Sequence, residues 1–140
     1  MINAGILDAN FFLRIIIGDQ PHQALPSKAL LQRIARGDVA AVLLPTVVLE
    51  IVFAMERQYG SSREQVCDAL LALFRIVKLE VVNREQLIGC LVDYRDRRGI
   101  SFADAYHCSM ARDFHDGAIV SFDRKLTSIP GVTRKEPNDV

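Results

Sequence analysis

Four acidic residues, spread along this chain of 140 residues, carry its most evident chemistry. In chain order they are Asp8, Glu50, Asp104 and Asp123. Asp8 and Asp123 directly follow short apolar runs, whereas Glu50 and Asp104 lie in the first turns of predicted helices. In open parallel sheets, ligands bind beyond the carboxyl ends of the strands. A cluster of carboxylates without histidine or cysteine is typical of a site for a hard cation such as Mg²⁺.

Clustering these acids has an electrostatic cost that a cation removes. Two carboxylates about 4 Å apart repel by about 1 kcal/mol in water and by about 4 kcal/mol near a protein surface. A divalent ion converts that cost into a binding site, and Mg²⁺ is commonly held by a couple of carboxylates, together with waters and phosphate oxygens. Such an ion can polarise a phosphoryl oxygen, activate water and orient the leaving group.

Each acid also has a purely structural interpretation. Asp8 and Asp123 can cap helices that follow their strands, and Asp104 can belong to a capping box at the start of its helix. Glu50 can be a solvated residue of an amphipathic helix. Against that last interpretation, Glu50 lies in the nearly unbroken apolar run 47–53, where a charged side chain needs a partner or a cation.

The elements that must position these acids alternate between strands and helices. Strands are predicted at residues 4–7, 39–44, 76–82 and 118–122, with a weak one around Val132. Helices are predicted at residues 11–16, 21–36, 45–59 (capped by Thr46) and 101–114, with capping boxes at 61–64 and 83–86 starting two more and a short turn or helix at 124–128. The alternation predicts an α/β fold with a mostly parallel central sheet, flanked by helices on both faces.

Length and composition limit the remaining choices. The chain is long enough for one domain, and half of its residues are hydrophobic, as in a globular protein. The 17 basic and 17 acidic residues cancel, so the net charge gives no electrostatic footprint for nucleic acid. Neither a signal peptide nor a membrane span is expected. The three cysteines lack Cys-x-x-Cys spacing, which favours a reduced, cytoplasmic protein with buried thiols.

The acids and their neighbours together resemble the PIN-domain ribonucleases, especially the VapC-type toxins of toxin–antitoxin pairs. The matching segments are Ile6-Leu7-Asp8-Ala9-Asn10, Val48-Leu49-Glu50-Ile51-Val52, Phe102-Ala103-Asp104-Ala105 and Ser121-Phe122-Asp123-Arg124-Lys125-Leu126. The resemblance covers nearly the whole chain. It predicts a single PIN-like domain over residues 1–134 and a mobile tail at residues 135–140.

What the resemblance implies is an endoribonuclease that depends on Mg²⁺ or Mn²⁺ and hydrolyses RNA phosphodiester bonds. It assigns all four acids to catalysis, and the metal ligands would be Asp8, Asp104 and Asp123. It also implies homodimers and a cognate antitoxin whose peptide occupies the active-site groove. The alternative is a catalytically silent PIN-like module that binds RNA or a partner peptide.

Four further residues are expected to contact the RNA substrate. Asn10 and Ser121 match positions where the resembled family often has a supporting polar residue. Arg124 and Lys125 directly follow Asp123, where they can meet a phosphate near the metal.

The other polar residues are interpreted as structural. The three histidines have no ligand spacing with the acids and are predicted to be surface or packing residues: His22, His107 and His115. Asp93 and Asp96 are predicted to belong to a solvated helix end. The alternative prediction is that the arginines of this helix end contact RNA phosphates. A phosphatase with an aspartyl nucleophile is disfavoured, because Asn10 stands where such families usually carry a second aspartate.

Overall fold

The computed structural model describes residues 1–140 as two compact units, residues 1–82 and 83–140. The first unit contains β1 (Ile2–Ile6), α1 (Ala9–Ile17), α2 (Pro21–Ala35), β2 (Val39–Leu43), α3 (Pro45–Arg57), α4 (Arg63–Phe74) and β3 (Leu79–Val81). The second unit contains α5 (Arg84–Asp96), α6 (Phe102–Phe114), β4 (Ala118–Val120), the 3₁₀-helix η1 (Arg124–Ser128), β5 (Thr133–Lys135) and the 3₁₀-helix η2 (Pro137–Asp139).

The first unit is built on a three-stranded parallel sheet with the strand order β1-β2-β3. The middle strand, β2, buries alternate side chains, namely Val39, Ala41 and Leu43. Because parallel strands point the same way, their carboxyl ends meet at one edge of the sheet. Helices α1 and α3 both start just beyond this edge, directly after β1 and β2.

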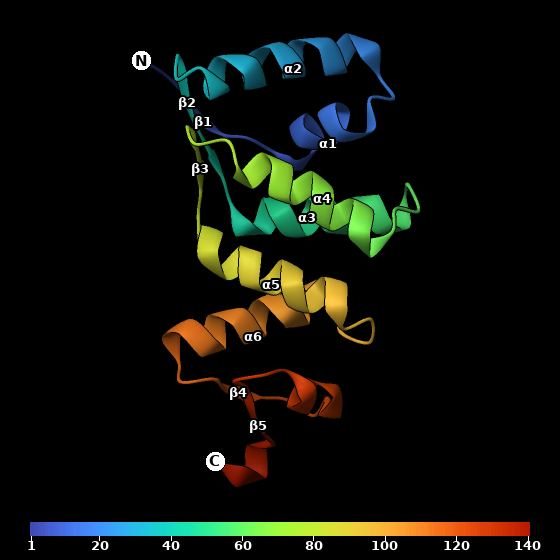
Figure 1. Ribbon diagram of the computed structural model, residues 1–140, viewed down its shortest axis with the longest axis vertical. Coiled ribbons are helices and arrows are strands. Elements are labelled where there is room, and N and C mark those ends of the chain that lie inside the picture. Colours follow the sequence, from blue (N-terminus) through green and yellow to red (C-terminus); the bar gives the residue numbers. More distant parts are fainter. The chain divides into compact units, whose positions relative to one another are not determined.

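The helices of the chain pack in consecutive pairs, α1 with α2, α3 with α4, and α5 with α6 (Figure 1). In the first unit, α3 and α4 supply much of the core, with Val48, Ile51, Val52, Val66 and Leu70 fully buried. Burying such aliphatic side chains contributes about 1.5–3 kcal/mol each before the entropy cost of folding. The α3–α4 pair therefore anchors the unit that carries Asp8 and Glu50.

Local sequence signals explain where these helices begin and end. Helix α1 stops at Gly18, whose φ of 72° lies in the left-handed region that favours glycine. The capping box of α4 joins Ser62 and Gln65, with hydrogen bonds of 3.1 and 2.8 Å, one residue later than the predicted box. The prediction that Thr46 caps α3 is wrong, because Leu44 occupies the cap and Pro45 stands at the first helical position, where its fixed φ suits a helix start.

The second unit combines the α5–α6 helix pair with a two-stranded parallel sheet of β4 and β5. Ser101 caps α6 by accepting a hydrogen bond from the Asp104 N–H at 3.1 Å. The predicted capping box at residues 83–86 is absent. Asn83 has a left-handed φ of 56° and makes no cap bond, and the Gln86 side chain instead donates to Asp113 at 2.8 Å.

The α/β class and the parallel pairing of the strands are confirmed. The strands fall into one sheet of three and one of two. The segment predicted as a tail begins with Lys135, the last residue of β5, and contains η2; its mobility and the domain boundary at residue 134 stay predictions. None of the helices combines the length and apolar character needed to cross a membrane.

The three cysteines are free and buried: Cys67, Cys90 and Cys108. Burial raises the pKa of the Cys108 thiol to about 11, with smaller effects from Arg112, Asp104 and Asp93. A thiol with such a pKa stays protonated at neutral pH and is a poor nucleophile and metal ligand. This agrees with the prediction that the cysteines act as small hydrophobic residues.

Candidate active site

Asp8 lies between β1 and α1, just beyond the carboxyl end of the strand. The Leu7 N–H donates to the Val42 carbonyl at 3.0 Å, which holds the chain against β2 up to Asp8. The exposed Asp8 side chain caps α1, since its Oδ1 accepts from the Phe11 N–H at 3.0 Å. The capping interpretation of Asp8 is thus confirmed, and it occupies only one of the two carboxylate oxygens.

Asp8 and Asn10 line a pocket of about 330 Å³ between the N-terminal part of α1 and α2. Arg14 and His22 also line this pocket, which we call the α1–α2 pocket. Arg14 was not among the site residues predicted from the sequence, and the exposed His22 was predicted to be a surface or packing residue. The signal that could have found Arg14 is its position one helical turn after Asn10, which places both on the same side of α1.

Glu50 is exposed on α3, although it lies in an apolar stretch of sequence. It stands beyond the first turn of α3, so the prediction that placed it in the first turn is wrong. The helix buries Val47, Val48, Ile51 and Val52, and the helical period turns Glu50 away from that face. Since Glu50 is not buried, the prediction that it needs a partner or a cation is wrong. Its assignment to catalysis stays a prediction.

Asp104 lies in the first turn of α6, where it is partly buried. Its backbone N–H donates to the Ser101 hydroxyl, but its carboxylate makes no hydrogen bond. The second hydrogen bond of a capping box, from the Ser101 N–H to the Asp104 side chain, is therefore absent. Both carboxylate oxygens are therefore available to a cation or substrate.

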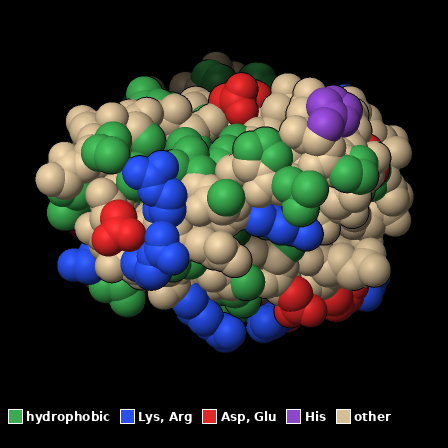
Figure 2. Space-filling view, turned by 90° about the horizontal axis from the view of Figure 1, so that it is seen from above, with side chains coloured by type: hydrophobic (Ala, Val, Ile, Leu, Met, Phe, Trp, Pro, Cys, Tyr) green, Lys and Arg blue, Asp and Glu red, His purple; other side chains and the backbone are tan.

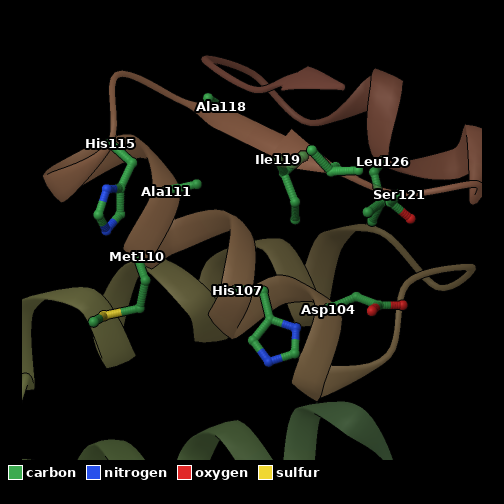
Figure 3. Close-up of a pocket in the computed structure, with 10 residues that line it drawn as sticks. Asp104, His107, Met110, Ala111, His115, Ala118, Ile119, Ser121 and Leu126 are labelled. Atoms are coloured by element: carbon green, nitrogen blue, oxygen red, sulfur yellow. The ribbon is translucent and has the colours of Figure 1, made fainter. Parts of the chain in front are cut away.

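A second pocket, of about 370 Å³, lies between α6 and the β4–η1 segment. Asp104 and Ser121 lie toward one end of this pocket, with His115 toward the other and His107 between them (Figure 3). Both histidines are exposed. The structure thus brings two of the predicted site residues, Asp104 and Ser121, to one pocket of the second unit.

Asp123 caps η1, because its Oδ1 accepts from the Lys125 N–H at 3.0 Å. The Ser121 hydroxyl accepts from the Asp123 N–H at 3.0 Å and so fixes the backbone that carries the acid. Arg124 and Lys125 follow on η1 with exposed side chains. As with Asp8, the cap leaves one carboxylate oxygen of Asp123 for another partner.

The donor set of the acids fits a hard cation. Asp8, Asp104 and Asp123 can supply only oxygen ligands. Each has at least one carboxylate oxygen that accepts no hydrogen bond within the protein. Asp8 and Glu50 belong to the first unit, and Asp104 and Asp123 belong to the second. Neither unit by itself gathers three potential metal-ligating side chains. A common site for the four acids therefore stays a prediction.

Asp93 is not the solvated residue that its sequence context predicts. It is buried on α5, where its Oδ2 accepts from Arg112 of α6 at 2.8 Å and its Oδ1 lies 3.8 Å from Arg97. Arg112 also donates to the Pro130 carbonyl at 3.1 Å. This network ties the second unit together, so Asp93 has a structural role, whereas Asp96 is exposed as predicted.

The family comparison agrees with the α/β fold. The PIN domain family matches residues 5–132, a span that includes all four acids, and the chain belongs to that family. PIN domains are generally nucleases, and PIN nucleases generally use divalent metals. No curated protein matches the chain.

Proposed function

We propose that this protein is a metal-dependent endoribonuclease that hydrolyses RNA phosphodiester bonds. The observation that carries the proposal is the family match over residues 5–132, combined with acids at all four positions quoted from the sequence. The available carboxylate oxygens of Asp8, Asp104 and Asp123 support it further.

In the proposed mechanism, Asp8, Asp104 and Asp123 hold Mg²⁺ or Mn²⁺, and Glu50 completes the acidic site. A bound divalent cation would polarise a phosphoryl oxygen and favour loss of a proton from water. The caps on Asp8 and Asp123 fix the direction of their side chains, which pre-organises them for this task. One of the four carboxylates takes the proton of the attacking water, whose oxygen bonds to phosphorus as the bond to the leaving oxygen breaks.

Four residues contact the RNA in this proposal. Arg124 and Lys125 offer exposed positive charges beside Asp123 and suit phosphate oxygens. Asn10 shares a pocket with Asp8, and Ser121 shares one with Asp104. Each of these polar side chains is therefore close enough to an acid to bind the nucleotide that the acid acts on.

The proposal extends to the toxin component of a toxin–antitoxin pair, acting as a homodimer in the cytoplasm. The three free, buried thiols suit a reduced compartment. An antitoxin can block such an enzyme by placing an arginine among the acids, because its planar fork meets a carboxylate with two hydrogen bonds. The alternative, a silent module that binds RNA or a partner peptide, predicts no cleavage.

Expression of the chain alone in a bacterial host should stop growth, because unrestrained cleavage of RNA is toxic. The Asp104→Asn variant should allow normal growth, and co-expression of the cognate antitoxin should restore growth to cells with the parent protein. Growth curves, with immunoblots of the soluble protein as a control, test this. Normal growth with abundant soluble parent protein would contradict the toxin assignment.

A further inference from the structure

We propose that the α1–α2 pocket binds one base of the RNA, next to the cleaved bond, and gives the enzyme a sequence preference. This inference rests on the proposed function. It assigns substrate-binding roles to Arg14 and Gln23, neither of which matches the acidic motifs. The pocket belongs entirely to the first unit, since its lining residues come from Asp8, α1 and α2. Figure 1 shows these two helices packed together.

The chemistry of the pocket walls suits a nucleobase. Asn10 and Gln23 carry side-chain amides, which offer a donor and an acceptor side by side and can pair with the edge of a base. Phe11 adds an aromatic wall, and its ring is steadied by an edge-on contact with the buried Phe12 at 5.0 Å between centroids. Bases in RNA stack on such rings and are read along their edges by amides.

Arg14 supplies a donor that has no partner within the protein. Its Nη1 donates to Asp19 at 2.8 Å, and the Tyr59 hydroxyl donates to the other oxygen of Asp19 at 3.3 Å, so the guanidinium is held in place. Its Nε is buried and has no hydrogen-bond partner, so it is out of reach of a ligand. The Nη2 group also makes no hydrogen bond within the protein, but it is not buried. An acceptor atom of a ligand in the pocket, such as a base carbonyl or ring nitrogen, would give Nη2 a partner.

The charges favour an uncharged group over a phosphate. The positive charge of Arg14 is offset by its ion pair with Asp19 at 2.8 Å, which leaves little charge to attract a phosphate. On the face seen in Figure 2, basic, acidic and hydrophobic side chains are interspersed rather than gathered in a basic patch. Hydrogen bonding and stacking therefore decide what binds here. Since Asp8 is an acid of the proposed centre, the bound base belongs to a nucleotide beside the cleaved bond.

The first test measures binding without cleavage. The intact ¹⁵N-labelled chain is titrated in EDTA with adenosine, guanosine, cytidine and uridine, which carry no phosphate. At least one nucleoside should shift the amide signals of α1 and α2 near the pocket. Gln23→Ala and Arg14→Lys should each weaken that binding by about threefold to tenfold, the effect of one or two lost hydrogen bonds.

A control variant separates the pocket from general effects. Gln32→Ala removes the same amide from an exposed position of α2 outside the pocket and should leave binding unchanged. The proposal is overturned if no nucleoside shifts these signals, or if Gln23→Ala and Arg14→Lys bind as tightly as the parent.

The second test reads sequence preference directly. A randomised single-stranded RNA pool is cut with the parent and the variants in Mg²⁺, and the ends are sequenced. The parent should favour one or two bases at a position beside the cut, and Gln23→Ala should reduce that preference by about fivefold or more. Cleavage with an unchanged preference in both pocket variants overturns the pocket assignment alone. Nucleoside binding without any cleavage by the parent overturns the proposed function and leaves the base pocket standing.

Discussion

Asp8→Asn and Asp104→Asn are each expected to lower the rate of RNA cleavage by about 10²–10³-fold. A catalytic cation stabilises the transition state by several kcal/mol, and each 1.36 kcal/mol is a factor of about ten in rate. An amide oxygen is a neutral and weaker ligand than a carboxylate, so each change removes most of that stabilisation. Initial rates on a labelled single-stranded RNA in Mg²⁺ measure the effect.

Both variants should keep their folds, which makes the loss of activity interpretable. An asparagine at position 8 can still accept the hydrogen bond from the Phe11 N–H and cap α1. The carboxylate of Asp104 makes no hydrogen bond that an amide would lose. Asp68→Asn, at an exposed position of α4, is the matched control and should cut at the parental rate. If Asp8→Asn and Asp104→Asn also cut at that rate in Mg²⁺, the proposed mechanism is wrong.

Asp93→Ala is expected to destabilise the protein by about 3 kcal/mol, because removing one partner of a buried ion pair leaves the other charge uncompensated. The side chains of Asp93 and Arg112 are 11% and 22% exposed, so solvent screens their 2.8 Å contact only weakly. The remaining bond from Arg112 to the Pro130 carbonyl limits the loss. Urea unfolding, followed by circular dichroism, gives the change in unfolding free energy.

The matched control for Asp93→Ala is Asp96→Ala on the same helix. Asp96 pairs with its neighbour Arg95 at 3.0 Å, but both side chains are about half exposed. Exposed pairs contribute about 0–1 kcal/mol, so this variant should unfold almost like the parent. Equal stability of the two variants would mean that the Asp93–Arg112 pair does not hold the second unit together.

The sequence was most informative where structure depends on neighbouring residues. Gly18 ends α1 and Ser101 caps α6, close to the predicted helix limits at residues 16 and 101, because both effects act within one helical turn. Asp8 and Asp123 also lie after β1 and β4, as the apolar runs before them predict, whereas their role in a common site stays a prediction. The same locality explains the near misses at the starts of α3 and α4. The cap falls on Leu44, before Pro45, instead of Thr46, and on Ser62 instead of the adjacent Ser61.

Features that depend on distant residues were not predictable. Asp93 pairs with Arg112, 19 positions later, so its sequence context as one of several charges at a helix end was misleading. The anchoring of Arg14 through Asp19 involves Tyr59, which is 40 positions from Asp19. Glu50 was misjudged for another reason, because an apolar stretch of sequence does not reveal which side of a helix is buried. The α1–α2 pocket likewise exists only once both helices pack.

The most direct test of the central claim is cleavage of a labelled single-stranded RNA by the purified parent protein, with and without a chelator. We expect cleavage in Mg²⁺ or Mn²⁺, no cleavage in EDTA, and recovery when an excess of the ion is restored. Cleavage that continues unchanged in EDTA, in a preparation whose Asp8→Asn variant is equally active, would contradict a metal-dependent acidic site. An absence of cleavage under all conditions, for RNAs that the protein binds, would favour the silent module instead.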